Sequence, residues 1–273
     1  MQKIMVDLIM NKSKDLTFSI IAYKNYNQII EAIKSINKYT QNYSKEIIVI
    51  DNTEIDFLDT YMQAIDEIKK QKDTIFISNK KNLGFGAANN IALKRATGTY
   101  FIICNPDILM IENSFDKIIP YFKKNPNVGA LIPKLIDRNH KIEPVYRRNL
   151  TLFDVFIRYF HPFHLFDKRQ AYHTMQDMDY SMPFKVPFGQ GSFLVVRTQL
   201  MKKLKGFDER YFMYVEDADL CRRINQISVL QYFPYTSIIH LWGKGSHKNL
   251  KLMRWHIAAM IKYFRKWGLK SDV

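Results

Sequence analysis

Short apolar segments alternate with amphipathic segments through the first hundred residues, and this alternation constrains the fold more than any other feature. Residues 26–39, for example, place Ile29, Ile33 and Ile36 on one side of a helix, since about 100° separates neighbouring residues. We expect strands at 17–23, 46–50, 74–78 and 100–104, and helices at 26–39, 57–71 and 85–96. Repeated strand–helix–strand units with short connections predict a mostly parallel sheet.

Polar residues follow the ends of these four expected strands, namely Tyr23, Asp51, Asn82 and Asp107. The carboxyl ends of parallel strands meet at one edge of a sheet, where ligands bind in folds of this kind. The sequence therefore predicts that the four residues converge on one site. The second half is less regular, with expected strands at 128–136 and 193–197 and an aromatic amphipathic helix at 152–160.

The composition restricts the compartment and the partners. A formal charge of +15 requires an anionic partner, which could be nucleic acid, nucleotide phosphates or an anionic membrane surface. Cys104 and Cys221 fall in an apolar strand and an expected helix, which is typical of buried, reduced thiols. The N-terminus lacks a signal-peptide pattern, and no apolar run approaches the roughly 20 residues that span a bilayer. These features predict a cytoplasmic protein without disulfides.

Residues 249–273 predict a basic amphipathic helix. Eight Lys or Arg residues and no Asp or Glu lie between Lys244 and Lys270. One face carries Met253, Ile257, Met260, Ile261, Phe264 and Trp267, and the other carries Lys251, Arg254, Lys262, Arg265 and Lys266, with Trp255 among them. Such a helix can lie on an anionic bilayer, or it can pack its apolar stripe onto its own domain and leave the basic face solvated. Both interpretations stay open at this point.

Two further motifs indicate chemistry on a phosphate-containing substrate. The glycine loop, residues 82–90, precedes a helix, and two glycines there allow a ligand to approach the backbone closely. It is not a dinucleotide fingerprint, because Asn89 stands where the third glycine would be. The acidic cluster Glu216-Asp217-Ala218-Asp219 opens an expected helix and suits a general base. Together with Asp107, it indicates a transferase that activates a hydroxyl against a phosphate leaving group.

The order of these motifs resembles the family 2 glycosyltransferases, and most closely their bacterial rhamnosyltransferase-like branch. The residues that carry the resemblance are Asp51-Asn52, Asn82-x-Gly84-Phe85-Gly86-x-x-Asn89-Asn90, Asn105-Pro106-Asp107, Gly191, Gly206-Phe207-Asp208-Glu209 and Glu216-Asp217-x-Asp219-Leu220. The resemblance implies an α/β fold of the GT-A type, with a mostly parallel Rossmann-like sheet and helices on both faces. It also implies a nucleotide-sugar donor, a divalent cation (Mg or Mn) and inversion at the anomeric carbon.

Roles follow from the resemblance for individual residues. It implies donor binding by Tyr23, Asp51, Asn82, Gly84, Asn90, Asn105 and Asp107, metal ligation by Asp107 and His240, and acceptor binding by Gly191, Glu216 and Asp219. Asp217 matches the base that deprotonates the acceptor hydroxyl. Asn105 departs from the family pattern, since an Asp commonly opens that triplet, and the substitution weakens charge-based metal binding.

We therefore expect a GT-A domain over 1–248, with a nucleotide-sugar half at about 1–110 and an acceptor half at 111–248, followed by the C-terminal helix. The expected reaction is inverting transfer of rhamnose from dTDP-rhamnose to a lipid-linked saccharide, at the inner face of the cell membrane. A UDP-hexose or UDP-N-acetylhexosamine donor is the alternative within the same fold. A nucleic-acid-binding protein is the alternative from another class, but no nucleic-acid-binding module is recognisable. The oligomeric state cannot be read from these features.

Overall fold

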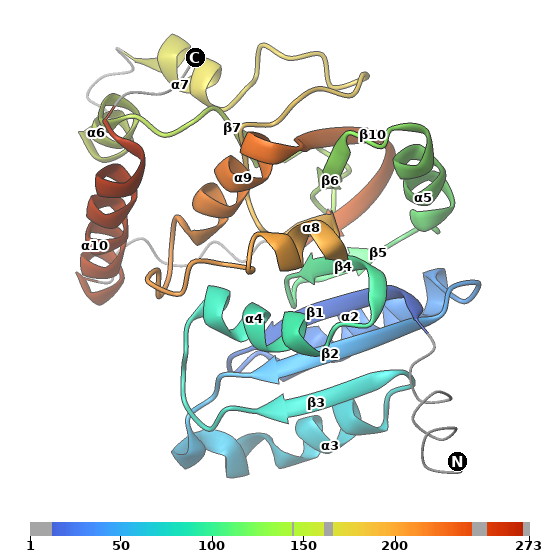
Figure 1. Ribbon diagram of the computed structural model, residues 1–273. Coiled ribbons are helices and arrows are strands. Elements are labelled where there is room, and N and C mark those ends of the chain that lie inside the picture. The colour runs from blue at the N-terminus through green and yellow to red at the C-terminus, as the bar shows by residue number, and fades with distance from the viewer. Residues whose placement is uncertain (1–12, 144, 161–165, 242–249, 270–273) are drawn as a thin grey trace.

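The computed structural model describes residues 13–143, 145–160, 166–241 and 250–269. An eight-stranded sheet in the order β3-β2-β1-β4-β9-β6-β10-β5 runs through them (Figure 1). Its strands are β1 (Lys14–Ala22), β2 (Lys45–Asp51), β3 (Thr74–Ser78), β4 (Gly98–Cys104), β5 (Ile108–Met110), β6 (Val128–Ile136), β9 (Phe193–Arg197) and β10 (Val229–His240).

The amino-terminal half of the sheet has the predicted alternation. Strands β3, β2, β1 and β4 are parallel neighbours, connected by helices α2 (Tyr26–Tyr39), α3 (Met62–Lys70) and α4 (Phe85–Arg95). The prediction of one α-helix over 57–71 is wrong in its first part. Ile55–Tyr61 instead forms a 3-10 helix, η1, in which the Phe57 amide bonds the carbonyl of Glu54 three residues back.

The second half adds strands of mixed direction. Strand β9 is antiparallel to both β4 and β6, β10 is parallel to β6, and β5 is antiparallel to β10. The predicted elements at 128–136, 152–160 and 193–197 are confirmed as β6, α6 (Leu152–Phe160) and β9. The remaining elements are α5 (Phe115–Lys124), α7 (Asp167–His173), α8 (Thr198–Lys203), α9 (Glu216–Ile227) and the ribbon of β7 (Tyr146–Arg147) and β8 (Phe188–Gly189).

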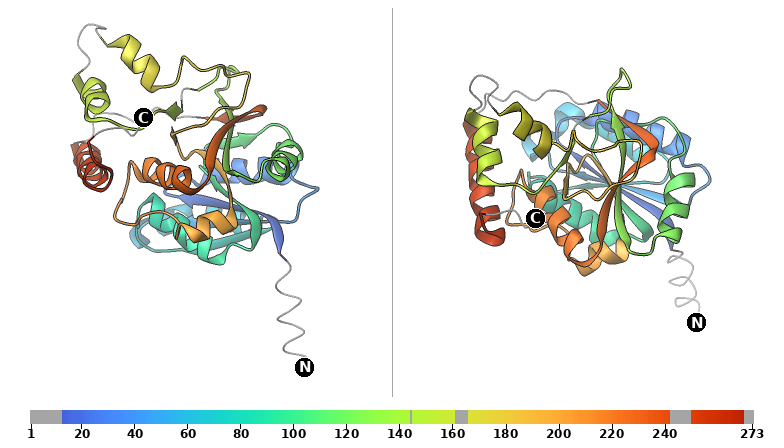
Figure 2. Two further views of the ribbon diagram at one scale, coloured as in Figure 1. Left: turned by 45° about the horizontal axis from the view of Figure 1, so that its top comes forward. Right: turned by 90° about the horizontal axis from the view of Figure 1, so that it is seen from above.

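Helices cover both faces of the sheet (Figure 2). Helices α2 and α3 pack together on one face, and α4, α8 and α9 pack on the other. The central strands are therefore buried on both sides, which explains why they read as continuous apolar runs. Phe18, Ile48 and Phe101 are fully buried, and each such side chain contributes roughly 1.5–3 kcal/mol to the free energy of unfolding. The predicted α/β sheet with helices on both faces is confirmed.

The C-terminal helix α10 (Leu250–Trp267) packs on the same domain through part of its predicted stripe. The buried contacts join Ala259, Met260, Tyr263 and Phe264 of α10 to Leu150, Tyr211, Val215 and Ala218. The rest of the stripe does not pack inward, because Met253, Ile257 and Ile261 stay exposed. Among the described residues, no helix combines the length and hydropathy needed to cross a membrane.

The predicted solvated basic face of α10 holds for Arg254 and Arg265, which are exposed. Lys266 is exposed as well, but its ammonium is paired, since its Nζ lies 2.6 Å from Asp219 Oδ1 and 2.9 Å from Asp208 Oδ2. Lys266 sits where the basic face turns toward the domain, and the fully buried Asp219 needs a cation there. The Lys262 ammonium is exposed but donates to the carbonyl of Arg210 at 2.7 Å.

Candidate active site

The first four strands bring the predicted polar residues to one edge of the sheet. Tyr23 follows β1, Asp51 ends β2, Asn82 follows β3 and Asp107 follows β4. Because these strands are parallel neighbours, their carboxyl ends point the same way (Figure 1). The topology thus places a row of donors and acceptors at the edge where α/β sheets bind ligands.

Asp51 lies at the bottom of this edge and is fully buried. Its Oδ1 accepts hydrogen bonds from the Tyr26 hydroxyl at 2.9 Å and from the Thr53 amide at 3.0 Å, whereas its Oδ2 has only a long contact of 3.4 Å from the Ser78 hydroxyl. Tyr23, which follows the neighbouring strand β1, is 42% exposed and donates to Glu54 at 3.1 Å. One fixed carboxylate oxygen and one freer oxygen suit recognition of a polar ring.

Hydrogen bonds with asparagine side chains hold the glycine loop in place. Asn82 Oδ1 accepts the Gly84 amide at 2.9 Å, and Asn52 Nδ2 donates to the Gly84 carbonyl at 3.1 Å. Gly84 has φ +83°, and a Cβ there would lie 2.1 Å from the carbonyl oxygen of Phe212. Only glycine fits, so the loop packs directly on the main chain of the segment that leads into α9.

Asn90 also joins α4 to the segment that leads into α9. Its side chain bonds residues 207 and 209 instead of facing the predicted donor pocket. Its Oδ1 accepts the Phe207 amide at 2.8 Å, and its Nδ2 donates to the Phe207 carbonyl at 3.0 Å and to Glu209 Oε1 at 2.9 Å. Its side chain is buried, and both of its polar atoms form hydrogen bonds within the protein. The motif 206–209 is therefore explained by a structural contact with α4, and no pattern along the chain predicts that contact.

Asp107 and His240, which the resemblance implies as metal ligands, lie side by side. His240 Nε2 is 3.5 Å from Asp107 Oδ2, and His240 Nδ1 is 2.6 Å from Glu143 Oε2. Burial lowers the pKa of His240, but hydrogen bonds and charge from Asp107 and Glu143 outweigh burial and hold it above its ordinary value. Sequence reasoning missed Glu143, which lies in an irregular segment and fixes the ring through its second nitrogen.

These residues fit a divalent cation in one respect. Asp107 Oδ1 is buried and has no hydrogen-bond partner, and a metal ion beside it would satisfy that oxygen. Within the part of the chain that is described, no three His, Cys, Asp or Glu side chains could hold a metal ion by themselves. Asp107 and His240 therefore offer an incomplete ligand set, which a diphosphate could complete.

The acidic cluster opens α9 after a strained turn. Tyr214 and Val215 both have left-handed backbones, with φ of 71° and 61°, and a β-branched residue adopts that conformation only under strain. The turn directs the first residues of α9 toward the sheet edge. Asp217 Oδ2 accepts the Gly191 amide at 3.3 Å, and its Oδ1 accepts the Ala218 amide at 2.8 Å.

Glu216 and Asp217 are neighbouring carboxyl groups in the first turn of α9, and the positive charge of Arg147 acts on Asp217. Burial raises the pKa of Asp217, and the amides of Gly191 and Ala218 oppose that rise only partly. Burial and the charge of Asp217 raise the pKa of Glu216 well above its usual range. Glu216 is buried, and its Oε2 has no hydrogen-bond partner in the structure. A proton shared near this pair is the expected result.

Asp219, predicted to contact the acceptor, is fully buried and turned away from Asp217's surroundings. Its carboxylate accepts from Arg223 Nε at 2.8 Å and Trp267 Nε1 at 2.8 Å, and the Lys266 ammonium lies beside it. The structure therefore does not bring Asp219 together with the other site residues. It joins α9 to the last turn of α10.

A cavity of about 530 Å³ is lined by both members of the carboxyl pair, Glu216 and Asp217. Other polar positions in its lining lie at the end of β4 and in the loop before β9, including Asn105, Gln190 and Gly191. Apolar side chains also line it, including Leu150, Val155, Ile157, Met213 and Met260. The backbone N–H of Asn105 donates to the carbonyl of Ser192 at 2.8 Å, which places Asn105 beside the residue that follows Gly191. The cavity thus runs from the end of β4 to helices α6 and α10.

An ion pair between Asp154 of α6 and Arg169 of α7 joins these two helices beside the cavity, and Asp154 itself lines the cavity. Asp154 accepts two hydrogen bonds from Arg169, at 2.8 and 2.9 Å, and one from Thr151 at 2.6 Å. His173 Nδ1 lies 3.4 Å from Asp154, and burial lowers the pKa of His173 to about 4. His173 is therefore neutral near pH 7, and this side of the cavity carries little net charge.

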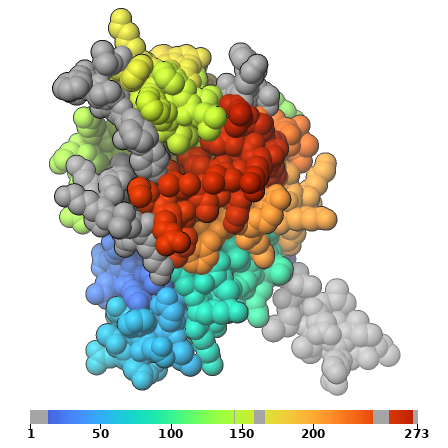
Figure 3. Space-filling model, turned by 90° about the vertical axis from the view of Figure 1, so that its left-hand side faces the viewer, coloured from blue at the N-terminus to red at the C-terminus, as the bar shows by residue number. Residues whose placement is uncertain are grey.

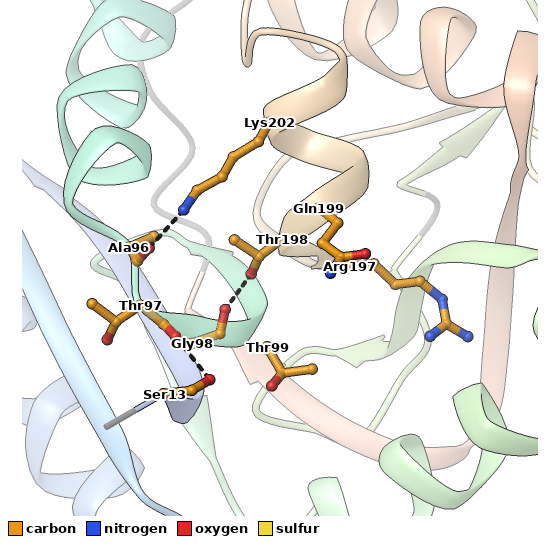
Figure 4. A pocket seen from close by; sticks show the side chains of 9 residues that line it. All are labelled: Ser13, Ala96, Thr97, Gly98, Thr99, Arg197, Thr198, Gln199 and Lys202. Atoms are coloured by element: carbon orange, nitrogen blue, oxygen red, sulfur yellow. Dashed lines mark hydrogen bonds between the residues drawn. The ribbon is translucent and has the colours of Figure 1, made fainter. Parts of the chain in front are cut away.

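A second cavity of about 500 Å³ lies at the opposite, amino-terminal ends of β1 and β4 (Figure 4). Lys202 donates to the Ala96 carbonyl there at 2.9 Å, and Thr198 donates to the Gly98 carbonyl at 2.6 Å. These lining side chains satisfy backbone groups of the protein itself. The chemistry of the sequence motifs gathers at the other edge.

Solved structures define the class of this fold. Mannosyltransferase PcManGT from Pyrobaculum calidifontis, in complex with GDP-Man and Mn²⁺, matches with a TM-score of 0.61 at 16% identity, over 93% of this chain and 65% of that one. GalNAc-T7 with UDP, GalNAc and Mn²⁺ matches with a TM-score of 0.63 at 15% identity, over 86% of this chain and 45% of that one. The fold is that of the GT-A glycosyltransferases, as predicted.

The profile of glycosyl transferase family 2 matches residues 17–204, and the chain belongs to this family. Rhamnosyltransferase WbbL of Escherichia coli (strain K12) is 26% identical over 265 residues, which cover 93% of this chain and 94% of that protein. The N-acetylglucosaminyl-diphospho-decaprenol L-rhamnosyltransferase of Mycobacterium tuberculosis is 29% identical over 177 residues, 58% of this chain and 56% of that protein. The chain thus spans about half of the mycobacterial relative. The predicted resemblance to the rhamnosyltransferase-like branch is confirmed.

Gly84→Ala should destabilise the protein more than Gly268→Ala. Both glycines have left-handed backbones, but a Cβ at Gly268 meets nothing within 4 Å, whereas one at Gly84 meets the carbonyl of Phe212. The conformational cost is about 1–2 kcal/mol at each, and the clash adds about 1–3 kcal/mol at Gly84. Urea unfolding of the two variants measures the difference, and equal losses would contradict the close contact.

Glu216→Gln should flatten the dependence of stability on pH. A carboxyl whose pKa is raised by folding binds its proton more tightly in the native state, so stability falls as pH rises from its ordinary pKa, about 4.3, through the raised value. The variant has no such proton and should be the more stable form on the alkaline side of this window. Thermal unfolding across the window tests this, and parallel curves for both proteins would exclude the raised pKa.

Proposed function

We propose that the protein is a metal-dependent, inverting glycosyltransferase in which Asp217 is the general base. The observation that carries this proposal is the position of Asp217, which lines a cavity that also reaches Asn105 at the end of β4. Two amides hold its carboxylate, and burial raises its pKa toward the range in which a base works best.

The donor would lie along the carboxyl edge of β1 to β4. Asp51 and Tyr23 would bind the nucleotide, and Asn82 and Gly84 would shape the loop around it. Asp107 and His240 would hold a Mg or Mn ion, which supplies Lewis-acid stabilisation of the leaving diphosphate when bound. The unpartnered Oδ1 of Asp107 supports this assignment. Asn90 would act on the site indirectly, because its side chain holds the motif 206–209 against α4.

The acceptor would enter the cavity beside Gly191. Its hydroxyl oxygen attacks the anomeric carbon from the face opposite the diphosphate, the bond from that carbon to the phosphate oxygen breaks, and Asp217 receives the hydroxyl proton. Direct displacement of this kind inverts the anomeric configuration. Glu216 would influence the protonation of Asp217 as its buried neighbour.

The proposed donor is dTDP-rhamnose and the proposed acceptor is a polyprenyl-diphosphate-linked saccharide. The relatives named as rhamnosyltransferases support the sugar, and the mycobacterial name, which includes a diphospho-decaprenol, supports the acceptor class. A screen of dTDP-rhamnose against UDP-linked hexoses and N-acetylhexosamines tests the donor, and NMR of the product's anomeric configuration tests inversion. Turnover of UDP-sugars alone would replace dTDP-rhamnose by the alternative donor class.

Asp217→Asn should reduce transfer at least ~100-fold and leave donor binding intact, because the amide is nearly isosteric but cannot accept the proton. Initial rates and donor affinity measured on the same preparation check both statements. Glu216→Gln and Asp219→Asn serve as comparisons. Near-normal transfer by Asp217→Asn, with loss in either comparison variant, would assign the base to another residue of the cluster.

Asp107→Ala should abolish the metal dependence of donor binding, because the diphosphate would then face the acidic site without its cation. Donor affinity is measured by calorimetry with Mn²⁺ and with EDTA. Asp59→Ala, which removes an exposed acid from η1, should behave like the unchanged protein. If EDTA has no effect on binding or turnover by the unchanged protein, Asp107 and His240 hold no metal.

A further inference from the structure

Helices α6 and α10 each turn one side to the cavity and another to solvent. In α6, Val155 and Ile157 line the cavity, and in α10 His256 and Met260 line it. The two helices lie against each other on one face of the molecule (Figure 3). They therefore form a shared boundary between the cavity that Asp217 lines and the outside.

The outer sides of both helices are apolar. In α6, Leu152, Phe153 and Phe156 are 48%, 46% and 49% exposed. In α10, Met253, Ile257 and Ile261 are 42%, 48% and 48% exposed, although Phe264 and Met260 of the same helix are buried. Six large apolar side chains on two adjoining helices exceed the scattered exposure that soluble surfaces show, and such concentrations mark interaction sites.

Positive charge borders the apolar edge of α10. At about 100° per residue, Arg254 and Arg265 lie within roughly 40° of Ile261 around the helix, and both are exposed. No acidic residue occurs between Lys244 and Lys270. An apolar edge next to arginines, with no acid on the helix, is complementary to the hydrocarbon and headgroup layers of an anionic bilayer.

The lining of the cavity is partly apolar on the side of these helices. Val155 and Ile157 of α6 and Met260 of α10 line it, together with the polar Asp154 of α6 and His256 of α10, and Asp217 at the start of α9 lines it as well. A ligand with an apolar end and a polar end would match this lining if its apolar end lay against Val155, Ile157 and Met260.

We propose that the outer face of α6 and α10 rests on an anionic bilayer and that the lipid-linked acceptor enters the cavity along the boundary that these helices form. The acceptor route rests on the proposed function, since it assumes an acceptor joined to lipid. The bilayer contact does not depend on the proposed function. The saccharide then reaches Asp217 while the lipid stays against α6 and α10.

The test compares two fourfold variants of the full chain. The face variant combines Phe153→Gln, Phe156→Gln, Ile257→Gln and Ile261→Gln. The control variant makes the same change at four exposed apolar residues on other elements, Met62, Ile75, Met182 and Ile227. Each protein is sedimented with phosphatidylcholine vesicles, with and without phosphatidylglycerol, and is assayed with a long-chain polyprenyl-diphosphate saccharide in those vesicles and with a short-chain, water-soluble analogue.

The face variant should bind phosphatidylglycerol vesicles at least about tenfold more weakly than the control variant, because it lacks four apolar anchors. Its transfer to the vesicle-borne acceptor should fall by a similar factor, and its transfer to the soluble analogue should match that of the control. Equal vesicle binding by both variants would overturn the bilayer contact. Weaker binding with undiminished transfer to the vesicle-borne acceptor would overturn the route. Vesicle binding without turnover of any nucleotide sugar would refute the proposed function and leave the bilayer contact standing.

Discussion

The main chain of the glycine loop touches the main chain before α9 at Gly84, and both halves of the site depend on this contact. A side chain at Gly84 would enter the carbonyl of Phe212, so the two segments can meet only without one. Asn90 provides a second tie, through three hydrogen bonds to residues 207 and 209. The loop expected to hold the donor and the turn that aims Asp217 are thereby positioned by each other.

One turn of α9 shows how surroundings decide the behaviour of a carboxyl group. Asp219 is fully buried but has a guanidinium, an ammonium and an indole N–H around it, so its charge is compensated. Glu216, also buried, keeps an oxygen without a hydrogen-bond partner, and its pKa rises. The first arrangement stabilises the contact between α9 and α10, while the second favours the protonated form of the carboxyl group.

The sequence was sufficient to predict what depends on periodicity and on strand order. The edge carrying Asp51 and Asp107 could be predicted because a parallel sheet brings successive strand ends together. The antiparallel direction of β9 could not, since an apolar strand buried on both faces reads alike in either direction.

Contacts between side chains that are distant in sequence could not be predicted either. The contact of His240 with Glu143 spans 97 residues, and that of Trp267 with Asp219 spans 48. A pattern read along the chain distinguishes faces of one element but does not say what packs against each face. For this reason Asp219 was expected at the acceptor and Lys266 in solvent, although the Lys266 ammonium pairs with the buried Asp219 carboxylate.

That ion pair makes the last turn of α10 part of the framework of α9. Lys266 and Trp267 supply two of the three groups that surround the Asp219 carboxylate, two residues beyond Asp217. A truncation or fusion that displaces these two residues leaves the buried Asp219 carboxylate with Arg223 but without two of its three partners, and breaking part of a buried hydrogen-bond and ion-pair network is destabilising. The C-terminal end of this helix therefore tolerates less engineering than its place at the periphery of the molecule suggests, and an affinity tag is better joined at the other end of the chain.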